Sequence, residues 1–203
     1  MNGSGNFLRK GGFVLLSAIL LLGICATAAS QEKPTAFDLQ VRDMATACRD
    51  QVTAEMVKLV KGNKLTLAQL FDTFYIPIPD TDPQKYHTQY DRYTDETIRI
   101  ILDNYLAQDE RIKFVVAVDK NGYLPTHNSQ YSKPLTGDGA YDTQHNRTKR
   151  MFNDRTGLAA ARNEKPFLLQ SYSRDTGEVM MDLSVPIYIE GQHWGAIRIG
   201  YQR

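Results

Sequence analysis

The densest group of side chains that could do chemistry lies between Asn146 and Arg155. This segment, NRTKRMFNDR, carries five charges inside nine residues, and four of the five are basic. Arginine suits carboxylate or phosphate ligands because its planar fork donates two parallel hydrogen bonds. On a helix, Arg147, Arg150 and Asp154 would share one face. The pattern therefore has two interpretations, an anion-binding patch or a solvated face in which Arg147 pairs with Asp154.

The known catalytic and metal-binding motifs are absent from the sequence. It contains no Gly-rich phosphate loop and no G-x-S-x-G nucleophile turn. The four histidines are scattered without metal-ligand spacing, and no C-x-x-C-H sequence offers covalent haem attachment. We expect no metal, no cofactor and no enzymatic activity. Non-covalent haem bound through His127 or His145 stays open as an alternative.

Residues 1–30 have the pattern of an export signal. Arg9 and Lys10 precede an apolar core from Phe13 to Ile24, and small residues follow as far as Ser30. An uncleaved N-terminal membrane anchor is the alternative, because the apolar run can be extended to Ala29. Removing the two basic residues of this segment from the 24 in the chain leaves 22 against 23 acidic residues. This near-neutral body gives no argument for a nucleic-acid partner.

The exported body has the composition of a packed domain. The 203-residue chain is 42% hydrophobic and 23% charged. Of its two cysteines, Cys25 lies in the export segment, where bulky Ile24 disfavours lipoprotein processing. Cys48 then remains alone, as a buried thiol or one half of an intermolecular bridge.

Residues 31–109 are expected to be mainly helical. From Ala36 to Lys61, apolar residues recur at steps of three and four, which predicts one long helix that ends at Gly62-Asn63. A short helix capped by Thr66 follows, and another is expected from Thr94 to Leu106. Between them, three prolines in seven residues exclude helix and central strand. This Pro-rich segment is either a packed loop or a lid over a ligand.

Residues 110–203 read as a sheet interrupted by a helical excursion. The run FVVAV (Phe114–Val118) is a buried strand, Asn121-Gly122 is a tight turn, and a second strand leaves towards Asn128. About 40 residues intervene before three more strand-like runs, starting at Phe167, Val179 and Trp194. Pro186, inside the second of these runs, predicts a sheet edge or a bulge. The order predicts an α+β fold, with a PAS-like five-stranded antiparallel sheet packed against the long helix.

Five segments of the chain resemble the extracytoplasmic PAS-like Cache sensor domain of certain bacterial methyl-accepting chemotaxis proteins. They are LFDTFYIPIPDTDPQKYHTQYD, VDKNGYLPTHN, NRTKRMFNDRTGLAAARN, PFLLQSYSRDTGEVMMDLSVPIY and HWGAIRIGY, in the order of the family. The resemblance implies a periplasmic domain that binds a small molecule and signals in chemotaxis. In the family, a second membrane helix and a signalling region follow the sensor domain. Because this chain stops right after the last expected strand, we expect a free-standing module or a truncated relative.

The resemblance also implies where a ligand would bind. In PAS-like domains the ligand lies between the concave face of the sheet and the helical excursion. Six polar residues fall at such positions: His127, Asn128, Arg147, Arg150, Tyr172 and Asp182. An arginine would hold a carboxylate, the tyrosine would supply a ring and a hydroxyl, and the aspartate would accept from an amine or hydroxyl. Strand parity is not fixed without a register, so we expect about half of the six to face the ligand.

The sequence therefore supports two functions from different classes. The first is a periplasmic sensory module that binds a small molecule and forms a homodimer through the long helix. The second is a ligand-free accessory subunit that docks on a membrane receptor or an enzyme through the long helix and the Pro-rich segment. An occupied ligand site favours the first, and an exposed apolar stripe favours the second.

Overall fold

The computed structural model describes residues 1–2, 33–173 and 179–203, and the backbone alone of Tyr172 and Ser173. The predicted export segment, residues 1–30, lies outside the described residues except for its first two. Pro34–Arg203 form one compact unit. This unit combines helices with antiparallel strands, so the predicted α+β class is confirmed. Within the described ranges, every helix is too short or too polar to cross a bilayer.

Helix α1 (Ala36–Lys61) has the predicted bounds. Thr35 caps its start, where the Thr35 hydroxyl accepts from the Asp38 amide at 3.2 Å and the Asp38 carboxylate accepts from the Thr35 amide at 2.7 Å. Its end is set by Gly62 and by Asn63, whose φ is 55°. The predicted apolar stripe is buried within the chain's own unit, and it includes Cys48, whose thiol pKa is raised to about 12 by burial.

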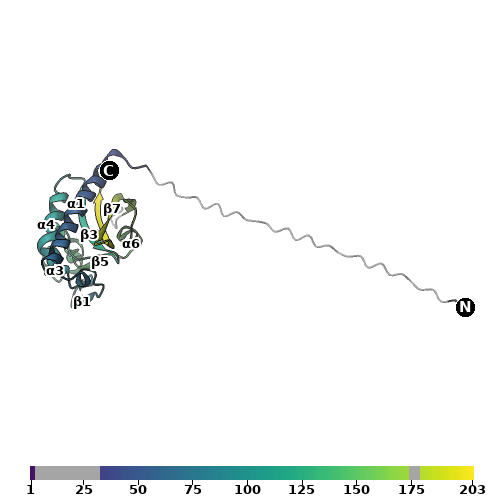
Figure 1. Cartoon of the computed structure of the whole chain (residues 1–203), viewed down its shortest axis with the longest axis horizontal. Helices are drawn as coiled ribbons and strands as arrows, with labels where there is room; N and C mark the ends of the chain where they lie inside the picture. The colour runs from purple at the N-terminus through teal and green to yellow at the C-terminus, as the bar shows by residue number, and fades with distance from the viewer. Residues whose placement is uncertain (3–32, 174–178) are drawn as a thin grey trace. The chain divides into compact units, whose positions relative to one another are not determined.

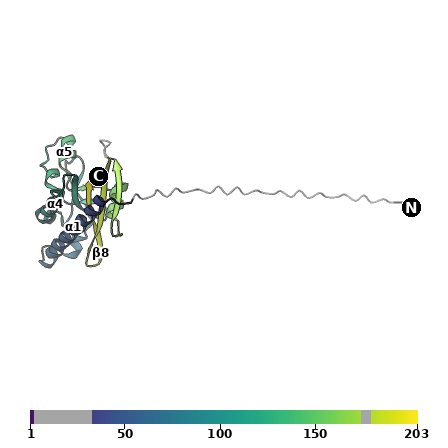
Figure 2. The same ribbon diagram turned by 90° about the horizontal axis from the view of Figure 1, so that it is seen from above.

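Four strands form the main sheet: β3 (Ile112–Asp119), β6 (Leu168–Ser173), β7 (Val179–Ile189) and β8 (Gln192–Tyr201). All pairs are antiparallel, in the order β3-β8-β7-β6. A tight turn joins β7 to β8, with φ of 49° at Glu190 and 79° at Gly191. Helices α1 and α4 (Arg99–Leu106) pack on one face of the sheet, and α6 (Arg155–Ala161) packs on the other (Figures 1 and 2).

The prediction of a five-stranded sheet is wrong, because the main sheet has four strands. The expected second strand is reduced to β4 (Tyr123–Leu124), which pairs with β5 (Arg150–Met151) and not with β3. Pro125 follows at once and has no N–H to donate to a ladder. The Val115 amide, on the outer edge of β3, donates instead to Asn128 Oδ1 at 2.9 Å. A side chain thus replaces the backbone partner that the fifth strand would have supplied.

The remaining elements surround the sheet. Short α2 (Leu67–Leu70) is capped by Thr66 as predicted, and the Pro-rich segment forms a small hairpin of β1 (Ile76–Ile78) and β2 (Lys85–His87). The next helix starts earlier than predicted, as α3 (Asp91–Tyr93) continued by the π-turn η1 (Thr94–Ile98). Thr94 is inside it, where its hydroxyl donates to the Asp91 carbonyl at 2.6 Å. The excursion carries η2 (Ser129–Tyr131) and α5 (Gly139–His145).

Candidate functional site

The face of the sheet opposite α1 carries a row of polar side chains. Successive strand residues point to opposite faces, and Leu183 packs in the core that contains α1. Asp182 and Ser184 therefore point to the other face, where both are 0% exposed. The register places Asp182 between Gln170 on β6 and Gly200 on β8. The candidate site is built around this part of the two central strands.

Arg198 on β8 binds Asp182 across the strands. Its Nε donates to Asp182 Oδ2 at 3.0 Å, and its Nη2 contacts the same oxygen. The other carboxylate oxygen, Asp182 Oδ1, and the nearby Ser184 Oγ are buried without a hydrogen-bond partner in the described structure. Leaving a buried polar group unpaired costs about 1–3 kcal/mol, so native proteins rarely do so without a reason. The two atoms are the sharpest sign of a binding role on this face.

Histidine 127 covers the site from the excursion side. Its ring centroid lies 4.7 Å from that of Tyr131 and 6.3 Å from that of Phe114, and the side chain is buried. Burial, reinforced by the positive charges of Arg147, Arg150 and Arg198, holds its pKa well below 6.5. Nδ1 accepts from the Asn128 amide at 2.7 Å, so in the neutral ring Nε2 carries the proton.

This environment predicts a specific pH dependence. In acid below about pH 6.5, the unfolded chain protonates His127 while the folded chain does not, so the free energy of unfolding falls as pH falls. One such histidine changes the free energy of unfolding by about 1.4 kcal/mol per pH unit between its pKa in the folded chain and its pKa in the unfolded chain. Urea titrations between pH 4.5 and 7.5 measure this slope, and the same titrations on His127→Gln isolate it. Parallel curves for the two proteins would refute the assignment.

Arg147 and Arg150 approach the site from the extended segment that contains β5. Both guanidinium carbons lie over the ring of Phe152, at 5.4 and 5.2 Å from its centroid. Arg150 Nη1 donates to the Thr143 carbonyl at 3.2 Å. Burial, followed by the charge of Arg147, lowers the Arg150 pKa to about 10, which leaves it protonated at pH 7.

The helical interpretation of residues 146–155 is wrong for most of the segment. Lys149 has a φ of 58°, which interrupts any helix there, and β5 starts at the next residue. Asp154 does not share a helical face with the arginines. Its Oδ1 caps α6 by accepting from the amides of Thr156 and Gly157, at 2.9 and 3.0 Å.

Asn128 has a structural role beside the site. Its Oδ1 closes the edge of β3, and its Nδ2 donates to Asp103 Oδ1 at 3.2 Å. Tyr172 pairs through its backbone with Met180, and its side chain lies outside the described residues. Of the six predicted ligand contacts, the structure thus gathers His127, Arg147, Arg150 and Asp182 around one face. Whether they bind a ligand stays a prediction.

Two polar residues of this face were not among the predicted contacts. Ser184 and Arg198 lie on β7 and β8, where a register is needed to place them beside Asp182. In the sequence of the last strand, Arg198 alternates with the apolar residues Ile197 and Ile199, which places its side chain on the other face of the sheet. That alternation was the one signal in the sequence that could have identified it.

Aromatic side chains bound the polar face. A Cβ added to Gly200 would stand 2.1 Å from Cε1 of Phe114, so the Phe114 ring lies directly against β8 beside Asp182. Phe114 and Phe152 both pack against a small hydrophobic cluster, separate from the main core, that includes Val116 and Leu124. The polar groups are therefore held in a largely water-excluded setting, where hydrogen bonds and charges act strongly.

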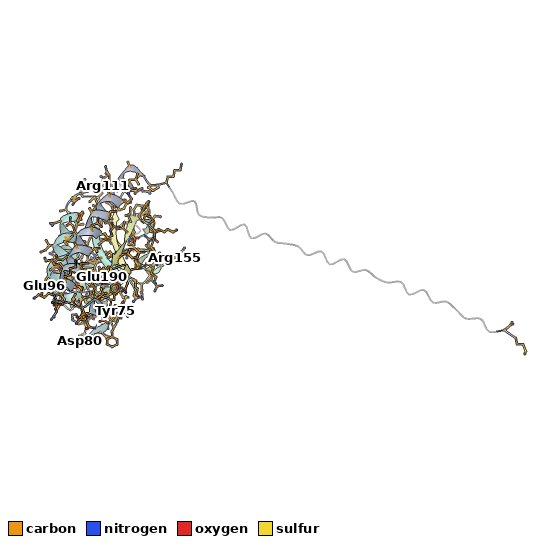
Figure 3. The ribbon with its side chains drawn as sticks, viewed as in Figure 1. Tyr75, Asp80, Glu96, Arg111, Arg155 and Glu190 are labelled. Atoms are coloured by element: carbon orange, nitrogen blue, oxygen red, sulfur yellow. The ribbon has the colours of Figure 1, made fainter. Side chains whose placement is uncertain are left out.

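Lysine 85 ties the Pro-rich hairpin to the segment that holds the arginines. Its buried Nζ donates to the Asn146 carbonyl, to Asn146 Oδ1 and to the Thr148 carbonyl, each at 2.9 Å. Movement of the segment around Arg147 would therefore be transmitted to β2 through these hydrogen bonds. Tyr75 and Asp80, which belong to this end of the unit, lie far from Arg111 at the other end (Figure 3).

In the described residues, no group of three His, Cys, Asp or Glu side chains is arranged to hold a metal ion. His145 is occupied locally, with its ring stacked on Tyr141 at a centroid distance of 4.0 Å.

No family model and no curated protein matches the chain. Three solved structures are similar, at low identity, to about four fifths of this chain. An extracellular ligand-binding receptor from Desulfohalobium retbaense is 14% identical over 81% of this chain, with a TM-score of 0.37. A domain of a sensory box/GGDEF family protein from Vibrio parahaemolyticus is 13% identical over 79%, with a TM-score of 0.36. A methyl-accepting chemotaxis protein from the same species is 17% identical over 80%, with a TM-score of 0.30.

These likenesses differ in how much of each protein they cover. The chain spans 25% of the length of the Desulfohalobium receptor, 61% of the sensory box domain and 95% of the chemotaxis protein structure. At such TM-scores, the description of the fold and of the site depends on the geometry of this chain alone. That geometry is an α+β unit with a long N-terminal helix and a buried polar face on a four-stranded antiparallel sheet.

Proposed function

We propose that this chain is a sensory module that binds a small molecule on the polar face formed by Asp182, Ser184, Arg198, His127, Arg147 and Arg150. The observation that carries the proposal is the pair of buried, unpartnered atoms Asp182 Oδ1 and Ser184 Oγ. A ligand that donates to both removes their cost. The proposal is of a binding protein and not of an enzyme, and it requires no cofactor.

Ligand binding would act on the rest of the unit through the segment that covers the polar face. His127, Arg147 and Arg150 all belong to residues 126–152, and Lys85 connects this segment to the Pro-rich hairpin. In the proposal, the ligand enters between the sheet and this segment, and its binding shifts the segment and the hairpin together. The lid interpretation of the Pro-rich segment becomes part of the proposed mechanism.

The finer assignment follows the resemblance of the sequence to Cache sensor domains. We propose a Cache-type domain that acts in chemotactic or related signal transduction in the periplasm, to which residues 1–30 would direct it. The apolar stripe of α1 is buried in its own unit. A homodimer through α1 would therefore use the polar side of the helix, which carries pairs such as Arg42–Asp43 and Arg49–Asp50.

One observation favours the accessory-subunit function as a second candidate. Phe74, two residues before the Pro-rich hairpin, and Ile76, on its first strand, are 73% and 51% exposed. Two large apolar side chains of this exposure, so close together in the Pro-rich segment, suit a contact with a partner such as a membrane receptor. Partner capture with and without Phe74→Ser tests this candidate separately from ligand binding.

A thermal-shift screen of the purified full chain tests the proposed function. The compounds are organic acids, amino acids, amines and quinone-like molecules, and an absorbance scan tests for haem. A ligand that binds only the folded state stabilises it by about 2.7 kcal/mol at 100 times its dissociation constant, which is a visible shift. At least one compound is expected to produce such a shift. A flat result for every compound, without a chromophore, would contradict the sensor function.

A further inference from the structure

Side chains that are readily oxidised form a continuous row in and beside the main core. Trp194, the only tryptophan of the chain, has its ring centroid 5.9 Å from that of Tyr90. The centroid of Tyr90 lies 6.3 Å from that of Tyr123, which lies 5.2 Å from that of Tyr75. Indole and phenol rings are among the side chains that lose a single electron most readily, and rings at these spacings are in contact. We call this row, from Trp194 through Tyr90 and Tyr123 to Tyr75, the aromatic path.

The two ends of the aromatic path differ in where a proton can go. At the buried end, Trp194 is 2% exposed, and its Nε1 donates to the Leu70 carbonyl at 2.9 Å. A peptide carbonyl is too weak a base to remove the indole proton, so an oxidised Trp194 would stay a reactive radical cation. At the other end, Tyr75 is half-buried, and its hydroxyl donates to Asp119 Oδ2 at 2.6 Å. This carboxylate can receive the proton when the phenol loses its electron.

Tyr75 has the best proton acceptor of the three tyrosines on the path. The Tyr90 hydroxyl donates to the same Asp119 oxygen from 3.1 Å, and the Tyr123 hydroxyl reaches Asp91 Oδ2 only at 3.3 Å. Burial raises the pKa of Asp119, which makes its carboxylate a stronger base. Burial, followed by the charge of Asp119, also raises the pKa of Tyr75, so the proton lies on the phenol before oxidation. An oxidising equivalent on the path is therefore expected to come to rest at Tyr75.

From this arrangement, we propose that the aromatic path carries an oxidising equivalent from Trp194 to Tyr75, while Asp119 receives the Tyr75 proton. Trp194 first loses one electron to an oxidant of the radical class, such as a peroxyl radical, which becomes the corresponding peroxide anion. An electron then passes along the path from Tyr75 to Trp194, and the phenol proton moves to Asp119. The products are neutral Trp194, a neutral Tyr75 phenoxyl radical and protonated Asp119. Charge is conserved, because the indole cation and the carboxylate anion are both neutralised.

The path would give the unit a protective function that does not depend on the proposed ligand binding. A radical cation that stays at Trp194 oxidises the buried groups around it. The Tyr75 radical lies instead at the end of the unit that carries the Pro-rich hairpin, on a side chain that is partly exposed (Figure 3). A soluble reductant can return the missing electron there, and the proton then returns from Asp119.

Ultraviolet photoionisation of the full chain tests the proposal. Indole absorbs at longer wavelengths than phenol, so a flash at the long-wavelength edge forms the radical at Trp194, and an acceptor in solution removes the ejected electron. Time-resolved absorbance follows the indolyl and phenoxyl radicals, which have separate visible bands. The indolyl signal is expected to decay as the phenoxyl signal rises, at a rate that is independent of protein concentration. The transfer is expected to be slower in D2O, because a proton moves with the electron.

Conservative variants connect the signals to the named residues. Tyr90→Phe keeps the ring but replaces phenol by the far less oxidisable benzene ring, so the fast transfer is expected to be lost. Tyr75→Phe is expected to lose the long-lived phenoxyl signal, and so is Asp119→Asn, whose amide cannot take up the proton. Tyr105→Phe is the matched control, because Tyr105 is 7% exposed, lies outside the path and accepts from Gln51 Nε2 at 2.8 Å. It is expected to leave both signals unchanged.

The proposal is overturned by any of three results. A rate of phenoxyl formation that rises in proportion to protein concentration would show that electrons pass between molecules. Wild-type kinetics in Tyr90→Phe would show that the row of rings is not the route, and a long-lived phenoxyl signal of full yield in Tyr75→Phe would show that Tyr75 is not its end. Circular dichroism checks that each variant is folded. If Asp119→Asn does not fold, the two tyrosine variants decide the question.

Discussion

Replacing Asp182 by Ala is expected to lower the free energy of unfolding by about 3–5 kcal/mol. Asp182 is 0% exposed, and Arg198 donates to its Oδ2 from both Nε and Nη2. Truncation of the carboxylate removes this partner from a guanidinium group that stays buried on the central strands. Urea denaturation at pH 7, followed by circular dichroism, measures the change.

A double variant tells whether the loss comes from removing the carboxylate that faces Arg198. Asp182→Leu with Arg198→Leu removes both charges and fills the space with apolar side chains, so it is expected to recover most of the lost stability. The Asp182→Ala variant losing less than about 1 kcal/mol would contradict the buried ion pair. Equal instability of the single and double variants would show instead that packing at these positions decides the cost.

Replacing Asp119 by Ala is expected to cost at least about 3 kcal/mol, because the carboxylate organises four donors at the end of β3. Its Oδ2 accepts from the Tyr75 hydroxyl at 2.6 Å and from the Tyr90 hydroxyl at 3.1 Å. Its Oδ1 accepts from the amides of Asn121 and Tyr123 at 2.9 and 3.0 Å. The variant leaves these donors without their acceptor in a buried aromatic cluster. It also removes the two hydrogen bonds that hold the turn after β3.

The matched control for Asp119 is Asp43→Ala on the exposed side of α1. Asp43 pairs with its neighbour Arg42, and its side chain is 69% exposed, so its loss is expected to change the free energy of unfolding by less than about 0.5 kcal/mol. Denaturation of both variants under the conditions used for Asp182 completes the comparison. Similar stabilities for the Asp119 and Asp43 variants would show that the four donors find other partners.

The sequence predicted best those elements whose signals are local. The α1 helix came out with its predicted bounds, because its stripe repeats over 26 residues and its end is marked by Gly62 and Asn63. Pro186 also met its prediction. The pairing of β6 with β7 stops at Ser184, so Pro186 has a strand on one side only, and the register shifts after Ile187.

The sequence failed where a distant side chain competes with a local pattern. The strand expected after Gly122 is cut short because Asn128 Oδ1 binds the Val115 amide, a contact between residues 13 apart. Arg147 and Arg150 do not share the expected helical face, because Arg150 lies on β5. This strand pairs with β4, some 27 residues earlier, through Tyr123–Met151 and Leu124–Arg150. Neither contact has a signal in the spacing of the residues.

The candidate site shows the same division. Arginines that suit an anion could be recognised by residue type, and Asp182 could be placed on a strand. The pairing of Asp182 with Arg198 and the position of Ser184 depend on the register of β7 and β8, and a shift of one residue would turn all three to the α1 face. That register is fixed by the long-range packing of Leu183 and Ile199 in the main core.

The most direct test of the account is the dissociation constant of the best compound from the screen, measured by calorimetry for the wild-type chain, Arg150→Gln and Arg155→Gln. Arg150→Gln is expected to weaken binding by about 30-fold, and Arg155→Gln is expected to leave the affinity within about twofold of wild type. Equal affinity of all three proteins would contradict the central claim, since the ligand would then bind away from the polar face of the sheet.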